Sequence, residues 1–374
     1  MKLRHIKQRR QKLTDREIWF WINNIEGIGN IKIRRMLEFF ESPRHIYNAG
    51  EDELIQVQGL NLNDISKITD FSIKDNARRK YEQCMKKGIN CVFPFEEEYP
   101  ERLKELYDKP FILYYRGKIP DQSTPAVSII GSRKCSEYGR FIAGELGRIL
   151  GEAGVNIISG LALGIDSEAH KGCVLAGGRT YGVLAGSVER CYPASNYNLY
   201  MDILGNGGII SEFPPGTPTV PGLFPVRNRI VSGLADMVIV VEAGTKSGSL
   251  ITVAHALEQN RTVYAVPGRI GDKFSEGCNR LIEEGAGIIT SFDTIIHELG
   301  LTVSNVKKYE KKDNGLAREE KMLYSLLLDF IPKSLDSIIE KSNMPFNAVL
   351  VGLMGLELKG YIKEISKNFY VRIR

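Results

Sequence analysis

Cysteine is scarce in this sequence, and its few residues lack the spacing that a metal-binding or redox site requires. The six cysteines form no C-x-x-C pair and no zinc-binding pattern, which argues against zinc modules and thioredoxin-like sites. We interpret them as reduced and mostly structural, as is usual in the cytoplasm. No metal or other cofactor is expected.

Long apolar runs are missing as well. The basic start, MKLRHIKQRRQKLTDREIWFWI, is not followed by an apolar stretch long enough for a signal peptide or a transmembrane helix. We therefore expect a cytoplasmic protein without a membrane partner.

The two best-known phosphate loops are absent where one of them would be expected. Residues 125–139, PAVSIIGSRKCSEYG, read as a strand that passes through a glycine into a helix, a setting that favours anion binding. Gly131 is followed by Ser132 and Arg133, and the next glycine is Gly139, so neither G-x-G-x-x-G nor G-x-x-x-x-G-K-[ST] fits. An anion bound here would be held by Arg133 as well as by the backbone.

The sequence does contain a regular α/β pattern between residues 126 and 299. The 374 residues are 43% hydrophobic and 25% charged with a net charge of +5, an ordinary globular composition with room for two or three domains. Seven short apolar runs alternate with helix-like segments: AVSIIG, VNIISG, TYGVLAG, GGIISEF, DMVIVVEAG, TVYAVPG and AGIITS. This pattern predicts a Rossmann-like parallel sheet with helices on both faces, whose functional loops collect at one edge.

The loops that follow these strands are rich in glycine, hydroxyl and basic residues. The basic residues in or just beyond them are Arg133, Lys134, Arg227, Arg229, Lys246, Arg269, Lys273 and Arg280. Any one of these arginines alone would more often be a cap or an ion-pair partner. Five such loops at one edge favour a cationic surface for a polyanion.

The N-terminal flank contains a glycine hairpin between two helix-like runs. INNIEGIGNIKIRRMLEFF places Gly27 and Gly29 in the hairpin and Lys32 just inside the second run, which matches a helix-hairpin-helix. A weaker echo, LIQVQGLNLNDISKI, has Asn61 in place of the second glycine. Two interpretations stay open: a secondary DNA contact through Gly27, Gly29 and Lys32, or a plain packing module.

The C-terminal flank predicts three helices and a short hairpin, which is a winged helix. Its third helix carries no Lys or Arg between Pro345 and Leu358, so partner binding or packing is expected rather than base-specific reading. The predicted organisation is a helical helix-hairpin-helix or SAM-like domain (1–85), a Rossmann-like domain (86–300, core 126–299), a linker (301–317) and a winged-helix domain (318–374).

Four stretches together resemble the DNA-processing protein A family, also called Smf. They are SIIGSRKCSEYG, IISGLALGIDSEAHKG, FPVRNRIVSGLADMVIVVEAGTKSGSLITVAHAL and AVPGRIGDKFSEGCNRLIEEGA. The resemblance implies a homodimer without catalytic turnover that binds single-stranded DNA with little sequence preference. It also implies that the protein protects incoming or exposed DNA and loads RecA recombinase onto it, as in natural transformation.

The resemblance also implies roles for particular residues. The phosphate-binding residues would be Gly131, Ser132, Arg133, Arg227, Asn228, Arg229, Lys246, Ser247, Ser249 and Arg269. Phe224 would offer a face on which a base stacks. Such a division is physically reasonable, because cations follow the DNA backbone while one aromatic ring accepts any base.

The end of the predicted sheet offers a candidate surface for self-association. Leu281, Ile282 and Ile288 are apolar and lie close to the last predicted strand. An uncovered sheet edge favours a partner, whereas the alternative is that all three belong to the ordinary core.

An enzyme acting on a nucleotide is the competing class. Nucleoside-monophosphate phosphoribohydrolases with this kind of sheet carry P-G-G-x-G-T-x-x-E, with a catalytic glutamate. The corresponding loop here, EAGTKSGSL, has Lys246 and serines instead. We therefore expect no catalytic residues.

Overall fold

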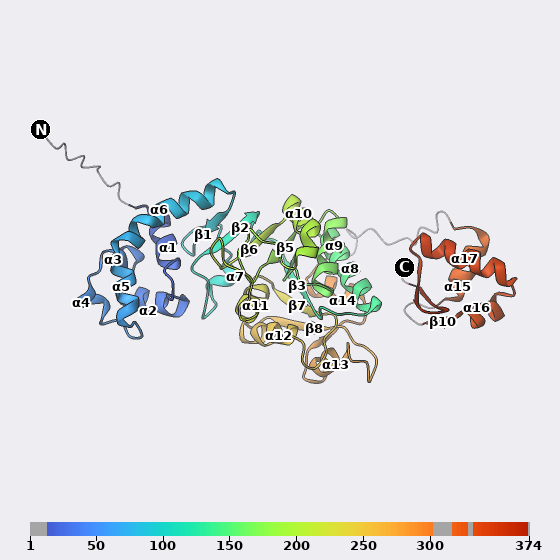
Figure 1. Cartoon of the computed structure of the whole chain (residues 1–374). Coiled ribbons are helices and arrows are strands. Elements are labelled where there is room, and N and C mark those ends of the chain that lie inside the picture. The colour runs from blue at the N-terminus through green and yellow to red at the C-terminus, as the bar shows by residue number, and fades with distance from the viewer. Residues whose placement is uncertain (1–12, 302–315, 328–331, 373–374) are drawn as a thin grey trace, which may run out of the picture.

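The computed structural model describes residues 13–301, 316–327 and 332–372. Figure 1 shows a helical N-terminal part, a central sheet with its helices, and a small C-terminal part, in that order along the chain. The basic N-terminal start and most of the predicted linker 301–317 lie outside the described residues.

The N-terminal part is built from short helices around one apolar core. Ile22, Met36, Ile46, Leu54 and Ile68 are each fully buried in it. The helices are α1 (Asp15–Asn23), α2 (Asn30–Phe40), α3 (Pro43–Asn48), α4 (Glu51–Leu54), α5 (Leu62–Thr69) and α6 (Phe71–Lys86). Local signals set their starts: Thr14 and Glu17 form a capping box before α1, and Pro43 occupies the first position of α3.

The central part is a nine-stranded sheet in the order β1-β2-β6-β5-β4-β3-β7-β8-β9. The strands are β1 (Asn90–Val92), β2 (Leu113–Gly117), β3 (Ala126–Ile130), β4 (Asn156–Ser159), β5 (Thr180–Val183), β6 (Gly208–Ser211), β7 (Met237–Val240), β8 (Thr262–Ala265) and β9 (Gly287–Ile288). Strands β3 to β9 pair in parallel, which confirms the predicted Rossmann-like sheet. Strands β1 and β2 add an antiparallel edge that the sequence pattern did not predict.

Helices cover both faces of the sheet, as the apolar strands require. One face packs against α11 (Leu223–Gly233), α12 (Ser249–Glu258) and α13 (Glu276–Glu283), and the other against α8 (Glu137–Glu152), α9 (Ile165–Leu175) and α14 (Phe292–Glu298). Two further helices are α10 (Tyr197–Asn206), which packs on β2 and β6, and α7 (Glu101–Lys104), which packs against α11. The sheet therefore carries its loops at the strand ends, where a ligand has access.

The C-terminal part combines three helices with a three-stranded antiparallel sheet in the order β10-β12-β11, which fits a winged helix. Its elements are α15 (Arg318–Leu326), β10 (Lys333–Ser334), α16 (Leu335–Ser342), α17 (Phe346–Leu358), β11 (Ile362–Ser366) and β12 (Phe369–Arg372). Among the helices that the structure describes, none combines the length and the apolar character that a membrane crossing needs.

Candidate nucleic-acid interface

The parallel sheet has one point where strands are added in opposite directions. Strand β3 has β4 on one side and β7 on the other, so the loops that leave β3 and β7 diverge. Ligands of open α/β sheets bind at such a switch point, at the carboxyl ends of the strands. A cavity of about 910 Å³ lies there, and we call it the switch-point pocket; residues 131–134, 244–249, Phe224 and Arg227 form part of its lining.

The loop after β3 is held tightly on both of its sides. A Cβ atom at Gly131 would lie 2.6 Å from Ile165 and 2.8 Å from the carbonyl oxygen of Glu242, so only glycine fits without movement. The Ser132 N–H donates to that Glu242 carbonyl at 2.8 Å, and the Ser132 carbonyl accepts from the Ile165 N–H at 3.3 Å. The backbone is thus fixed between β7 and α9, while the Arg133 side chain is left exposed.

An aromatic ring in the pocket is surrounded by two guanidinium groups. The Arg133 guanidinium carbon lies 4.8 Å from the centroid of the Phe224 ring, and that of Arg227 lies 5.9 Å from it. Tyr192, which is 48% exposed, adds a second ring 5.8 Å from Phe224 at a tilt of 55°. The pocket therefore brings a base-stacking surface next to a cation that can hold phosphate.

Four exposed cations line the switch-point pocket: Arg133, Lys134, Lys246 and Lys273. Within the described part of the chain, none of the four forms an ion pair, so their charges remain available to an anion. Arg133 and Lys246 were predicted from the sequence as phosphate ligands. Lys134 and Lys273 were predicted only as basic residues in or just beyond the loops that follow the strands.

The loop after β7 places hydroxyl groups beside Lys246. The hydroxyl oxygens of Ser247 and Ser249 lie 2.7 Å apart, and the Ser249 N–H points to the Ser247 hydroxyl at 3.4 Å, where α12 begins. The Asn228 amide reaches the Gly248 carbonyl at 3.5 Å and so links α11 to this loop. The four predicted residues Asn228, Lys246, Ser247 and Ser249 therefore all lie at one wall of the pocket.

Arg227 lies in the floor of the pocket rather than on its surface. Its side chain is 5% exposed, and one guanidinium nitrogen donates to the Gly160 carbonyl at 2.7 Å and also to the Val183 carbonyl. Burial lowers the pKa of Arg227 to about 10, although the neighbouring Asp166 carboxylate opposes this shift. Asp166 in turn accepts from the Gly160 N–H at 3.0 Å. This geometry makes Arg227 a brace for the ends of β4 and β5, whereas the sequence predicted a direct phosphate contact.

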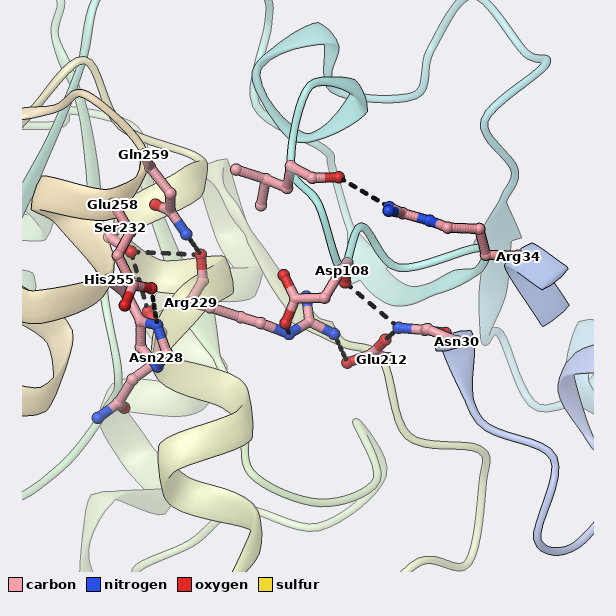
Figure 2. Close-up of polar contacts among 11 residues, drawn as sticks. Asn30, Arg34, Asp108, Glu212, Asn228, Arg229, Ser232, His255, Glu258 and Gln259 are labelled. Atoms are coloured by element: carbon pink, nitrogen blue, oxygen red, sulfur yellow. Dashed lines mark hydrogen bonds and ion pairs between the residues drawn. The ribbon is translucent and has the colours of Figure 1, made fainter. Parts of the chain in front are cut away.

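Arg229 does not line the switch-point pocket, and its predicted place in the cationic track is corrected here. Figure 2 shows its guanidinium between two carboxylates: Nε lies 2.9 Å from Asp108, and Nη2 lies 2.5 Å from Glu212. The side chain is only 5% exposed, so its charge is neutralised inside the protein. The Asn30 amide donates to the other Glu212 oxygen at 2.5 Å. Arg229 therefore helps to hold the N-terminal helices against the central sheet.

The N-terminal hairpins form an internal repeat whose basic residues are already engaged. Gly27 and Gly59 both have positive φ, 87° and 88°, and form equivalent turns. Lys32 donates to the Gly27 carbonyl at 3.0 Å and pairs with the buried Asp64 at 2.8 Å. Across the repeat, Lys67 donates to a carbonyl of the first hairpin at 2.9 Å.

These contacts bear on the possible secondary DNA contact through Gly27, Gly29 and Lys32. Gly29 caps α2 with its backbone alone, and Lys32 holds the two hairpins together instead of presenting a free charge. The geometry favours the packing interpretation for Lys32.

Arg269 lies in a second cavity, away from the predicted phosphate loop. This cavity of about 620 Å³ is also lined by Tyr138 of α8 and by Ile365 and Val371 near the C-terminal hairpin. Lys363 of β11 pairs with Glu137 of α8 at 2.6 Å beside it. The exposed Arg269 side chain is thus separated from the four cations of the switch-point pocket.

The three residues proposed for self-association have different surroundings. Leu281 is 9% exposed and belongs to the core, and Ile282 packs against the same core. Ile288 is 44% exposed and lies on β9, which pairs with β8 at the end of the sheet. Only Ile288 therefore presents an apolar side chain at the open edge.

Phe274 lines the pocket, while Tyr192 and Glu242 each contact a residue that lines it, and none of the three had a clear signal in the sequence. Tyr192 follows a strand loop without a motif of its own, and Phe274 lies in a glycine-rich stretch with no regular spacing. Glu242 closes β7 and turns out to hold the start of α8. Residues two apart on a helix do not face the same side, so the spacing of Arg227 and Arg229 was a signal that they would not line the same pocket.

Comparison with known proteins identifies the family of this chain. Residues 90–300 match the family model of DNA recombination-mediator protein A. Protein Smf of Escherichia coli is 31% identical over 375 residues, and the match covers 97% of each chain. DNA processing protein DprA of Streptococcus pneumoniae is 35% identical over 289 residues, which is 77% of this chain and 99% of that protein. The chain belongs to the DNA recombination-mediator protein A family, which confirms the resemblance to DNA-processing protein A and Smf.

Two solved structures support the same assignment. DNA processing protein A of Streptococcus pneumoniae superposes with a TM-score of 0.61 at 33% identity and covers 77% of this chain and 99% of its own. DNA processing protein A of Helicobacter pylori, whose single-stranded DNA binding mode has been described structurally, gives a TM-score of 0.51 at 30% identity and covers 56% of this chain and 95% of its own.

Proposed function

We propose that this protein binds single-stranded DNA in the switch-point pocket, protects it, and passes it to RecA recombinase. The observation that carries the proposal is the Arg133 guanidinium 4.8 Å from the Phe224 ring, inside a pocket with three further exposed cations. Cations spaced along a groove neutralise successive phosphates, and an aromatic ring stacks on an unpaired base. The family assignment and the described DNA binding of the Helicobacter pylori relative point to the same ligand.

The predicted phosphate ligands then take different roles. Arg133 and the Ser132 hydroxyl on one wall, with Lys246 on the other, hold the DNA backbone, and Gly131 lets their loop pass close to Ile165 and Glu242. Asn228, Ser247 and Ser249 add hydrogen bonds on that second wall. Arg227 supports the floor from below, and Arg269 contacts DNA only where the strand leaves the pocket.

The protein acts without catalytic turnover in this proposal. A phosphoribohydrolase would need a glutamate that reaches the bound nucleotide from the loop after β7. Glu242, at the end of that strand, is 2% exposed and hydrogen-bonds to Ser136 at the start of α8, so its carboxylate is used within the fold.

Self-association and location complete the proposal. We place a homodimer contact at the open edge of β9, around Ile288, because an edge strand with one unpaired side and an exposed apolar side chain favours a second copy. All six cysteines are free, as is usual in the reducing cytoplasm where RecA acts.

The proposal is tested by titrating a fluorescent oligothymidine with the purified protein and with two single variants. Arg133→Ala should raise the Kd about tenfold, because one charge-assisted phosphate contact is lost beside the Phe224 ring. Arg280→Ala is the matched control, since Arg280 is an exposed arginine of α13 paired with Glu284 and is not part of the pocket lining. Equal affinity for all three proteins would contradict the proposed site.

The transfer to RecA has its own test. The protein should shorten the lag before RecA assembles on single-stranded DNA, and Arg133→Ala should lose most of this effect. An unchanged lag with the unaltered protein would limit the function to DNA binding.

A further inference from the structure

A buried carboxylate occupies the place where phosphate binds in many nucleotide-binding folds. Glu242 follows β7, is 2% exposed, and lies against the first turn of α8. Its carboxylate accepts the Ser136 N–H at 2.9 Å and also the Ser136 hydroxyl. A Cβ atom at Gly139 would overlap this carboxylate, so the helix makes room for it with a glycine.

The carboxylate satisfies backbone groups that would otherwise attract an anion. The helix after the first parallel strand of a Rossmann-like sheet presents free N–H groups and the positive end of its dipole. Here the Ser136 N–H is bonded to Glu242, and the Gly139 N–H is bonded to the Ser136 hydroxyl at 3.0 Å. An external phosphate at this helix start would meet the negative charge of Glu242.

The same residue also holds both ends of the loop that carries the DNA-binding cations. The Glu242 carbonyl accepts the Ser132 N–H at 2.8 Å, and its side chain holds Ser136 at the other end. The intervening residues include Arg133, which lies over the Phe224 ring. The position of that guanidinium therefore depends on two contacts made by one residue.

We propose that Glu242 is a positioning residue that fixes residues 132–136, and that its carboxylate occupies the start of α8 so that no other anion binds there. A DNA strand is then bound on the outer side of the loop, by side chains. The terminal phosphate of a single nucleotide is excluded from the N-terminal end of α8, because the Glu242 carboxylate occupies it. This inference rests on the proposed function for its DNA part, whereas its phosphate part stands without it.

The DNA part is tested by a double-mutant cycle measured as oligothymidine affinity of the full chain. Glu242→Ala should raise the Kd about tenfold, because the loop loses its anchor at Ser136. Arg133→Ala should then add less than about twofold in the Glu242→Ala background, whereas Lys246→Ala should keep its full effect, since coupled residues are not additive and separate ones are. Additive effects for Glu242 and Arg133 in folded variants would overturn the positioning role.

A second variant guards against a misfolded Glu242→Ala protein. Gly139→Ala keeps the carboxylate but places a methyl group where it lies, and it should show the same coupling to Arg133. Glu242→Gln should rescue part of the affinity, because it retains one acceptor oxygen at the same length. An affinity of Glu242→Gln no better than that of Glu242→Ala would contradict the role of the hydrogen bonds.

The phosphate part uses inorganic phosphate as the probe and thermal unfolding as the readout. Phosphate should stabilise Glu242→Ala more than the unaltered protein, because the freed helix start gains an anion. Equal stabilisation of both proteins would overturn this exclusion of other anions. If the unaltered protein does not bind oligothymidine at all, the proposed function fails, while the phosphate comparison still decides the role of Glu242.

Discussion

Removing the ring of Phe224 should weaken the binding of single-stranded DNA without changing how that binding depends on salt. The ring carries no charge and lies 4.8 Å from the Arg133 guanidinium, so it contributes stacking rather than phosphate neutralisation. Loss of one stacked base costs about 1–3 kcal/mol, which corresponds to a rise of about 5- to 150-fold in the Kd.

The salt dependence itself follows from the exposed cations of the switch-point pocket. Arg133, Lys134, Lys246 and Lys273 are exposed and line the pocket, and each neutralises about one phosphate. Each contact with a single strand adds about −0.7 to the slope of log K against log salt, so four contacts give about −2.8. Between about 50 mM and 200 mM salt the affinity should therefore fall about 50-fold.

Single substitutions separate the two contributions. Lys246→Ala should make the slope shallower by about 0.7, whereas Phe224→Ala should leave it unchanged within error. Arg227→Ala should act differently again, because it removes a buried donor from two carbonyls and leaves Asp166 without its nearby cation. We expect a loss of on the order of 3–5 kcal/mol in the free energy of unfolding.

The assay is fluorescence anisotropy of a labelled oligothymidine at several sodium chloride concentrations, with urea unfolding of each variant as the control. A Phe224→Ala protein whose slope changes as much as that of Lys246→Ala would refute the division between stacking and phosphate contacts. A fully stable Arg227→Ala protein with a shallower slope would show that Arg227 contacts DNA directly, as the sequence alone predicted.

Three further predictions follow from the same structure. The first concerns the buried His170. The Thr180 hydroxyl donates to the Ile157 carbonyl and therefore accepts from His170 Nδ1 at 2.6 Å. Burial lowers the pKa of His170 to about 3, below its ordinary 6.5. Because the pKa of His170 is lower in the folded state than in the unfolded state, the neutral imidazole stabilises the fold fully above pH 6.5, and this stabilisation is lost as the pH falls. Urea unfolding should therefore show a decrease of about 2 kcal/mol in the free energy of unfolding between pH 6.5 and 5 that the His170→Gln variant does not show. An equal decrease in both proteins would contradict this prediction. Arg229→Met should lower the free energy of unfolding by about 3 kcal/mol without changing the salt slope of DNA binding, because its charge is already paired, and a shallower slope would place it at the DNA. Ile288→Arg should give a folded monomer in light scattering, whereas a dimer that persists would exclude the β9 edge as the contact.

The sequence predicted the parallel sheet because its signals are local. Each of the seven apolar runs that became β3 to β9 is rich in β-branched residues and is bounded by glycine or polar residues. The edge that collects the loops follows from the parallel direction alone. By contrast, β1 pairs with β2, and β2 joins the sheet through β6, which lies about ninety residues further along the chain, so this antiparallel edge has no local signal.

The site was predicted in part for the same reason. Arg133 and Lys246 lie in the loops after β3 and β7, so their place at the pocket follows from the chain direction. The ion-pair partners of Arg229 could not be predicted from local sequence, because Asp108 and Glu212 come from other segments of the chain. Arg227 was expected in or just beyond a loop, whereas it lies on α11, whose first turn contains Pro225, a position where proline is tolerated.

The central claim is that the switch-point pocket takes an unpaired strand, and a direct competition between single-stranded and duplex DNA tests it. A labelled oligothymidine bound to the protein would be displaced by unlabelled single strand or by duplex of the same length, at one fixed salt concentration. Phe224 can stack only on an unpaired base, so single strand should compete at least about tenfold better than duplex, and Phe224→Ala should reduce this preference. Duplex that competes as well as single strand, or a preference that Phe224→Ala leaves intact, would contradict the account.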